Sequence, residues 1–290
     1  MTATFTKIAL VGGGGAVGRP ILDSLLAGGA ATVVVLSRPE STSTFPSHPN
    51  LAVERVKYDD VGAVAAILKK SSIEVLVSAV GGGGLEGQTL LADAAKQSGV
   101  QVFVPSEFGI PTEGVTEGFA VVKTRVADYS KSIGLPAARV YTGAFADQAS
   151  WIGSVKEKGK FLVLNPGDKA FSLTSLSDIG GFVAYALTSL PPTKLKDATF
   201  RLQGDRLSII GLANLFHELK SVPVERVNKF PEDIPGVQAK AYLAAQFNVG
   251  KGSSSWDHVQ NKDLGPGAIS NNLWEGHKWQ TIREVISSSQ

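Results

Sequence analysis

The 290-residue sequence contains no cysteine. This excludes disulfides, thiolate metal sites, iron–sulfur clusters and a cysteine nucleophile, and it is compatible with the cytoplasmic protein that we expect. Apolar runs such as Thr32–Leu36 are far shorter than the roughly 20 residues that a bilayer span requires. The first residues lack a charged segment followed by a separate apolar one, so we expect neither a signal peptide nor a membrane protein.

An excess of charge of one sign is also missing, since 28 basic and 26 acidic residues give a net charge of +2. Nucleic-acid binding usually requires a clustered basic face, so we expect no nucleic-acid partner. The motifs of two other enzyme classes, the Gly-x-Ser-x-Gly nucleophile elbow and the Gly-Lys-Ser/Thr phosphate loop, do not occur. We expect no metal site, because the four histidines are scattered: His48, His217, His258 and His277.

Apolar strands and amphipathic helices alternate through the first half of the chain. We expect strands over Lys7–Val11, Thr32–Ser37, Leu51–Lys57, Glu74–Val80, Gln101–Val104 and Ala138–Tyr141. We expect helices over Ala16–Leu26, Val61–Leu68, Leu90–Gln97 and Phe119–Ser132. Strands that are buried and apolar and alternate with helices predict a parallel sheet covered on both faces, in a Rossmann-type doubly wound α/β fold.

The alternation loosens after about residue 145. Readable elements there are strands over Phe161–Leu164 and Thr199–Leu202 and helices over Ile179–Leu190 and Ile209–Leu219. The stretch Asn248–Gly267 is polar and glycine-rich, which predicts a long loop. We therefore expect two domains, residues 1–150 and a smaller C-terminal α/β lobe over residues 151–290 that closes over a cleft. This boundary is soft, because a strand of the second half that rejoined the first sheet would shift it.

The run Gly12-Gly13-Gly14-Gly15-Ala16-Val17-Gly18 lies between the first expected strand and the first expected helix. It fits two glycine spacings, Gly12-x-x-Gly15-x-x-Gly18 and Gly13-x-Gly15-x-x-Gly18. Glycine permits positive φ, close approach of the backbone to a pyrophosphate, and tight packing of helix on strand. The helix N-terminus adds free N–H groups and a positive dipole end. The pattern predicts a dinucleotide site, and the alternative is a purely structural glycine turn.

The end of the second expected strand indicates which dinucleotide binds. An acidic residue there bonds the ribose of NAD, whereas a basic residue accommodates the 2′-phosphate of NADP. Arg38 stands twenty residues after Gly18, and Ser37 precedes it. A guanidinium can grip a phosphate with two parallel hydrogen bonds, so we expect NADP(H). The alternative is a solvated arginine that pairs with Glu40.

A second glycine cluster, Gly81–Gly84, follows the fourth expected strand. Ligands of doubly wound sheets bind at the carboxyl ends of the strands. We therefore expect the backbone of Ala79, Val80 and Gly81 to run along the cofactor. A flexible crossover loop is the alternative for the later glycines.

Lys123 is the candidate catalytic residue. Its helical neighbours at i−4, i−3, i+3 and i+4 are all apolar: Phe119, Ala120, Val126 and Ala127. An inward lysine has a lowered pKa, which suits a general acid or base near neutral pH. The alternative is a lysine whose stem covers apolar surface while its ammonium group reaches water.

Together these motifs resemble the isoflavone reductase-like branch of the NmrA-like family, which are atypical short-chain dehydrogenases. The most specific element is Pro105-Ser106-Glu107-Phe108-Gly109, and Thr142-Gly143-Ala144-Phe145 and Phe171–Gly180 add to it. The resemblance covers the chain to about residue 220.

The resemblance implies an NADPH-dependent reductase of aromatic or conjugated small molecules. Residues 1–150 would bind NADP(H) and residues 151–290 the substrate. Lys123 matches the lysine that binds the nicotinamide ribose and assists proton transfer. Ser106, Glu107 and Phe108 match the motif beside the cofactor, and Phe145 matches a residue of the substrate pocket.

One position leaves two functions open. Typical short-chain dehydrogenases have a tyrosine four residues before the lysine, and here that residue is Phe119. Its absence agrees with the isoflavone reductase-like enzymes and equally with NmrA-like proteins that sense NADP(H) without turnover. The sequence leaves open the substrate, the choice between monomer and homodimer, and whether the late tryptophans Trp256, Trp274 and Trp279 line a substrate pocket or are buried in a core or dimer contact.

Overall fold

The computed structural model describes residues 4–289, which form two compact units. The first unit comprises the chain up to Phe108 together with Thr112–Val140 and Ile179–Phe200. The second comprises Gly109–Pro111, Tyr141–Asp178 and the chain from Arg201 onward. The roles of residues 1–150 in cofactor binding and of residues 151–290 in substrate binding stay predictions.

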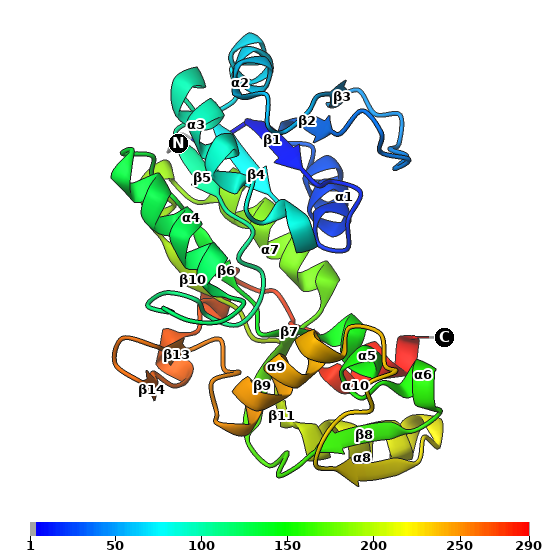
Figure 1. The fold of residues 1–290 in the computed structure, drawn as a ribbon. Helices are drawn as coiled ribbons and strands as arrows, with labels where there is room; N and C mark the ends of the chain where they lie inside the picture. Colours follow the sequence, from blue (N-terminus) through cyan, green and yellow to red (C-terminus); the bar gives the residue numbers. More distant parts are fainter. Residues whose placement is uncertain (1–3, 290) are drawn as a thin grey trace. The chain divides into compact units, whose positions relative to one another are not determined.

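A five-stranded parallel sheet forms the centre of the first unit (Figure 1). Its strands are β1 (Lys7–Val11), β2 (Thr32–Ser37), β3 (Leu51–Arg55), β4 (Val75–Ser78) and β5 (Val102–Val104). Their order is β3-β2-β1-β4-β5, and every neighbouring pair is parallel. The strand order reverses at β1, which makes the ends of β1 and β4 the switch point where such sheets bind ligands. The predicted Rossmann-type α/β fold is confirmed.

Helices cover both faces of this sheet because its strands present apolar side chains on both faces. The helices are α1 (Gly18–Gly28), α2 (Val61–Lys70), α3 (Gln88–Ser98), α4 (Val121–Ser132) and α7 (Leu176–Ser189). Ala9 and Val11 of β1 share a buried cluster with residues of α2, α3 and α4. Helices α1 and α7 are in close contact, since a Cβ on Gly180 would lie 2.4 Å from the carbonyl carbon of Pro20.

Four helix starts differ from the expected ones, and two of these are α3, which begins at Gln88 rather than Leu90, and α7, which begins at Leu176 rather than Ile179. Helix α1 begins at Gly18 rather than Ala16, because residues 12–17 form the turn that leaves β1. Helix α4 begins at Val121, so Phe119 precedes the helix. Strands β1, β2 and the later β8 (Phe161–Leu164) have the expected bounds.

The second unit is built from small sheets and short helices. Its strands are β7 (Ala144–Phe145), β8, β9 (Ala170–Thr174), β11 (Asp205–Ser208) and β12 (Val224–Val227), in the sheets β11-β9-β7 and β12-β8. Its helices are α5 (Ala149–Ile152), α6 (Val155–Lys158), α8 (Ile209–Lys220), α9 (Val237–Asn248) and α10 (Ile282–Ser288). Phe171 and Phe247 stack in its core with ring centroids 4.1 Å apart. Strands β6 (Arg139–Tyr141) and β10 (Thr199–Arg201) pair where the chain passes between the units.

Helix α9 was not predicted, and the expected loop over Asn248–Gly267 contains a small hairpin. That hairpin joins β13 (Trp256–Asp257) to β14 (Lys262–Asp263). Within residues 4–289, no helix has the length and apolar character required to cross a membrane.

Candidate functional site

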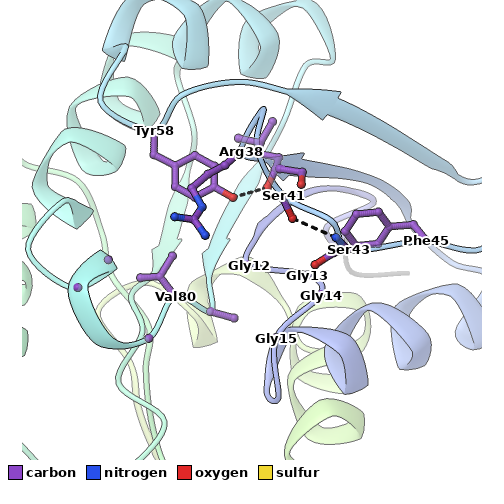
Figure 2. Close-up of a pocket in the computed structure, with 16 residues that line it drawn as sticks. Gly12, Gly13, Gly14, Gly15, Arg38, Ser41, Ser43, Phe45, Tyr58 and Val80 are labelled. Carbon is purple, nitrogen blue, oxygen red and sulfur yellow. Dashed lines mark hydrogen bonds between the residues drawn. The ribbon is translucent and has the colours of Figure 1, made fainter.

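A hollow of about 510 Å³ lies in the first unit, where β1, β2 and β4 end (Figure 2). The predicted cofactor residues that line it are Gly12, Gly13, Gly15, Ser37, Arg38, Ala79, Val80 and Gly81. Pockets for cofactors and similar ligands commonly measure about 300–1,000 Å³. The fold therefore brings the glycine turn, the end of β2 and the second glycine cluster around one space of suitable size.

At Gly12 and Gly18 the glycine turn packs so closely against other backbone atoms that a side chain would not fit. Gly12 has a φ of +79°, and a Cβ there would lie 2.6 Å from the carbonyl oxygen of Ala79. A Cβ on Gly18 would lie 2.1 Å from the carbonyl oxygen of Gly12. Val17, the N-cap of α1, makes no side-chain capping bond. The turn thus leaves open the helix N-terminus, which is suited to a phosphate group.

Arg38 extends from the end of β2 into solvent. Its side chain is 61% exposed, and its Nε lies 3.4 Å from Oε1 of Glu40, the partner that the sequence offered as an alternative. Exposed ion pairs contribute only about 0–1 kcal/mol. The pairing therefore leaves the guanidinium available to a bound phosphate at small cost.

Several residues that line the hollow were not predicted: Gly14, Leu36, Ser41, Ser43, Phe45, Tyr58, Gly83 and Gly84. Ser43 lies directly over the turn, since a Cβ on Gly14 would come within 2.3 Å of its Oγ. Figure 2 shows Arg38 and Tyr58 across the hollow from the glycine turn. Tyr58 is held there because its hydroxyl donates a 2.9 Å hydrogen bond to the carbonyl oxygen of Leu36.

A second hollow of about 350 Å³ adjoins the first and shares Arg38, Tyr58 and Gly84 with it. The other residues that line it are Glu40, Lys57, Asp59, Gly87, Leu90 and Leu91. The ring of Tyr58 and the side chains of α3 give this space apolar walls, which suit a flat aromatic group.

Lys123 lies on α4, half-buried, and its Nζ donates a hydrogen bond to the carbonyl oxygen of Glu107. Burial lowers the pKa of Lys123, and the nearby Glu107 carboxylate opposes this shift. Val126 and Ala127 are buried as expected. The expected stripe is wrong at Phe119, which is 66% exposed because it stands before the helix.

Glu107 is buried, with 1% of its surface exposed. Its Oε2 accepts a 2.8 Å hydrogen bond from Thr112, while its Oε1 has no partner among the described residues. Burial raises the pKa of Glu107, and the positive charge of Lys123 opposes that shift. These two desolvated side chains, near the end of β5, thus each oppose the other's pKa shift.

This burial predicts a pH-dependent stability. Between the ordinary pKa of 4.5 and the raised pKa, folded Glu107 keeps a proton that the unfolded chain has released. The wild type should therefore lose stability relative to Glu107→Gln as the pH rises through this window, with a constant difference above it. Denaturant unfolding at a series of pH values measures this difference, with the exposed Glu117→Gln as control. A difference that does not change with pH would contradict the prediction.

The Ser106–Phe108 motif does not line the first hollow but is hydrogen-bonded to its wall. The Ser106 hydroxyl donates a 2.6 Å hydrogen bond to the carbonyl oxygen of Val80, which lines the hollow. The backbone N–H of Ser106 donates to Oε1 of Gln88 at 2.8 Å. Phe108, the last residue of this segment in the first unit, is buried.

The remaining predicted site residues do not line the hollow. These are Ala16, Val17, Gly18, Ser106, Glu107, Phe108, Lys123 and Phe145. Phe145 lies on β7 in the second unit and is half-buried, so its part in a substrate pocket stays a prediction. Trp274 stacks on His277 with centroids 3.6 Å apart and meets Trp279 edge-on. No group of three or more metal-ligating side chains occurs in the described part of the chain.

Known proteins resemble this chain in sequence and fold. The oxidoreductase aprR of Aspergillus flavus is 31% identical over 186 residues, which cover 60% of this chain and only 61% of aprR. Phenylcoumaran benzylic ether reductase 1 of Arabidopsis thaliana is 25% identical over 306 residues, covering 97% of this chain and 98% of that protein. A solved structure of AtPrR2 with NADP+ and (+)pinoresinol has a TM-score of 0.76 at 19% identity, covering 98% and 99% of the two chains.

The family follows from a match that spans most of the chain. The profile of the NmrA-like family fits residues 4–252, a range that includes the glycine turn, the Ser106–Phe108 motif and Lys123. The resemblance inferred from the motifs is therefore confirmed, and the chain belongs to the NmrA-like family.

Proposed function

We propose that this protein is an NADPH-dependent reductase of an aromatic or conjugated small molecule. The observation that carries the proposal is the convergence of Gly12–Gly15, Arg38 and Ala79–Gly81 on one hollow. The names of two relatives, an oxidoreductase and a benzylic ether reductase, support the reaction class. The solved structure with NADP+ and pinoresinol supports the cofactor and an aromatic substrate.

The residues present fit a phosphorylated dinucleotide. The backbone of the glycine turn and the open N-terminus of α1 would hold the pyrophosphate. Arg38 and the Ser41 hydroxyl, which both line the hollow, would hold the 2′-phosphate. The second hollow beside Tyr58 would take the adenine. When bound, the nicotinamide supplies a hydride to an electrophilic carbon of the substrate.

Lys123 is the residue to which we assign the proton. Its half-buried Nζ is anchored on the carbonyl oxygen of Glu107, and its lowered pKa brings proton release closer to neutral pH. A general acid works best when its pKa lies near the operating pH. Lys123 would thus hold a proton at Nζ and transfer it to the oxygen that develops negative charge on the substrate.

A second candidate is a protein that senses NADP(H) without turnover. The observation that keeps it open is Phe119, which stands where typical short-chain dehydrogenases carry a tyrosine, has no proton to donate and is largely exposed. The two functions share the cofactor site and differ in chemistry. Oxidation of NADPH in the presence of phenolic enones, ketones or benzylic ethers supports the reductase, and tight binding without oxidation supports the sensor.

Arg38→Ala tests the cofactor assignment. Because a hydrogen bond to a charged group contributes about 1.5–3 kcal/mol, this variant should bind NADPH at least about tenfold more weakly. The affinity for NADH, which has no 2′-phosphate, should change little. Titration calorimetry measures both affinities, with the exposed Arg125→Ala on α4 as control. Equal losses for NADPH and NADH would reject the role of Arg38 at the 2′-phosphate.

A further inference from the structure

Arg55 ends β3 and lies beside the loop that carries Arg38. The parallel register pairs Arg55 with Ser37, the last residue of β2. From this position its Nη1 lies within hydrogen-bond distance of three oxygens of that loop. These are the carbonyl oxygen of Ser41 at 2.7 Å, the carbonyl oxygen of Arg38 at 3.1 Å and Oγ of Ser37 at 3.3 Å.

The three contacts hold a tight turn. The backbone N–H of Ser41 donates a 3.1 Å hydrogen bond to the carbonyl oxygen of Arg38, which closes a four-residue turn. Pro39 occupies its second position, where the fixed φ of proline favours such a turn. The carbonyl oxygens of Arg38 and Ser41 thus face the Arg55 guanidinium, while both residues also line the hollow.

Arg55 itself lines neither hollow. The segment from Ser41 to Pro49 contains no helix or strand, so regular secondary structure does not fix the turn on that side. Without Arg55, the turn would be held by its one backbone hydrogen bond and Pro39, with only the exposed Arg38–Glu40 ion pair and the 3.3 Å hydrogen bond from the Ser43 N–H to the Ser41 hydroxyl to orient the side chains. The positions of Arg38 and Ser41 therefore also depend on an arginine of the neighbouring strand.

We propose that Arg55 is a positioning residue that sets the preference for a 2′-phosphorylated cofactor by fixing the Arg38–Ser41 turn. This inference rests on the proposed function, because it assigns the 2′-phosphate to Arg38 and Ser41. Arg55 acts through these residues. Its loss should therefore weaken the binding of NADPH and leave that of NADH nearly unchanged.

The test compares Arg55→Met, Arg55→Lys, Arg38→Ala and the Arg55→Met/Arg38→Ala double variant by titration calorimetry with NADPH and NADH. Arg55→Met should bind NADPH about tenfold more weakly, the loss of one strong charge-assisted contact. Arg55→Lys should recover part of this loss. In the Arg38→Ala background, Arg55→Met should weaken NADPH binding little further, because both substitutions remove the same contact with the 2′-phosphate. Arg226→Met is the matched control, since Arg226 also lies on a strand, β12, and its guanidinium donates to a main-chain oxygen.

Three outcomes overturn the inference. Equal losses for NADPH and NADH with Arg55→Met would make Arg55 a general structural residue. Fully additive losses in the double variant would mean that Arg55 does not act through Arg38. A wild-type protein that binds NADPH no better than NADH would reject the proposed 2′-phosphate site as well. Only this last outcome counts against the proposed function.

Discussion

Replacing Gly18 with alanine should destabilise the protein by about 3 kcal/mol or more, because overpacking against fixed atoms is costly. The new Cβ would lie 2.1 Å from the carbonyl oxygen of Gly12 and 3.0 Å from the Cα of Gly13. Both are backbone atoms, so neither can rotate away as a side chain would. Relief requires α1 to move off β1, which opens the turn and should also abolish NADPH binding.

Gly28→Ala is the matched control for this change. It lies at the other end of α1, and a Cβ there meets no atom within 4 Å. Alanine is favoured over glycine in helices by up to about 1 kcal/mol, so this variant should be neutral or slightly stabilised. Denaturant unfolding of both variants gives the comparison. If Gly18→Ala matched Gly28→Ala in stability, the close packing of the glycine turn on α1 would be wrong.

Lys123→Met should lower the turnover of NADPH by a factor of about 10²–10⁴, the usual contribution of a general acid or base. Methionine keeps an unbranched apolar stem and removes the ammonium group that burial disfavours. The fold should therefore survive, and the thermal unfolding midpoint should not fall. The rate is followed by the loss of NADPH absorbance with a phenolic enone, ketone or benzylic ether that the wild type accepts.

Lys131→Met controls for the removal of a positive charge from the same helix, because Lys131 is exposed near the end of α4. It should retain the wild-type rate. Full activity of Lys123→Met would remove this lysine from the mechanism. If no substrate of the panel is reduced by the wild type although NADPH binds, the sensing function replaces the reductase.

The first unit could be predicted closely because its strands bury both faces. Strands β1 and β2 are continuous apolar runs, and glycines or polar residues end each of them. Helix α9 escaped prediction because a lysine occupies its buried face. The Lys240 side chain is fully buried, donates to Oγ of Ser154 at 3.0 Å and lies 4.8 Å from the centre of the Trp151 ring. Because these partners are distant in sequence, the sequence around Lys240 suggests a solvent-exposed position, whereas the structure buries it.

In the candidate site, too, some residues could be predicted from the sequence and others could not. The glycines and Arg38 could be found because their spacing from strand ends is set by the backbone geometry of the turn. Ser43 and Tyr58 reach the hollow from irregular segments, where no periodicity indicates which way a side chain points. Two serine hydroxyls shortly after Arg38 were a usable signal, whereas Tyr58 offered none. Arg55 could be recognised only from the register of β3 on β2.

Helix α7 limits how this protein can be divided. The N-terminal unit is completed by residues 179–200, far along the chain. Within this unit Phe182 shares a small apolar space with Val104 and Val140, and Gly180 fits against Pro20. A chain truncated at residue 150 would expose these surfaces to water. Domain exchange between relatives must therefore transfer both residues 1–140 and residues 179–200, and an isolated fragment meant to fold as the first unit must contain both.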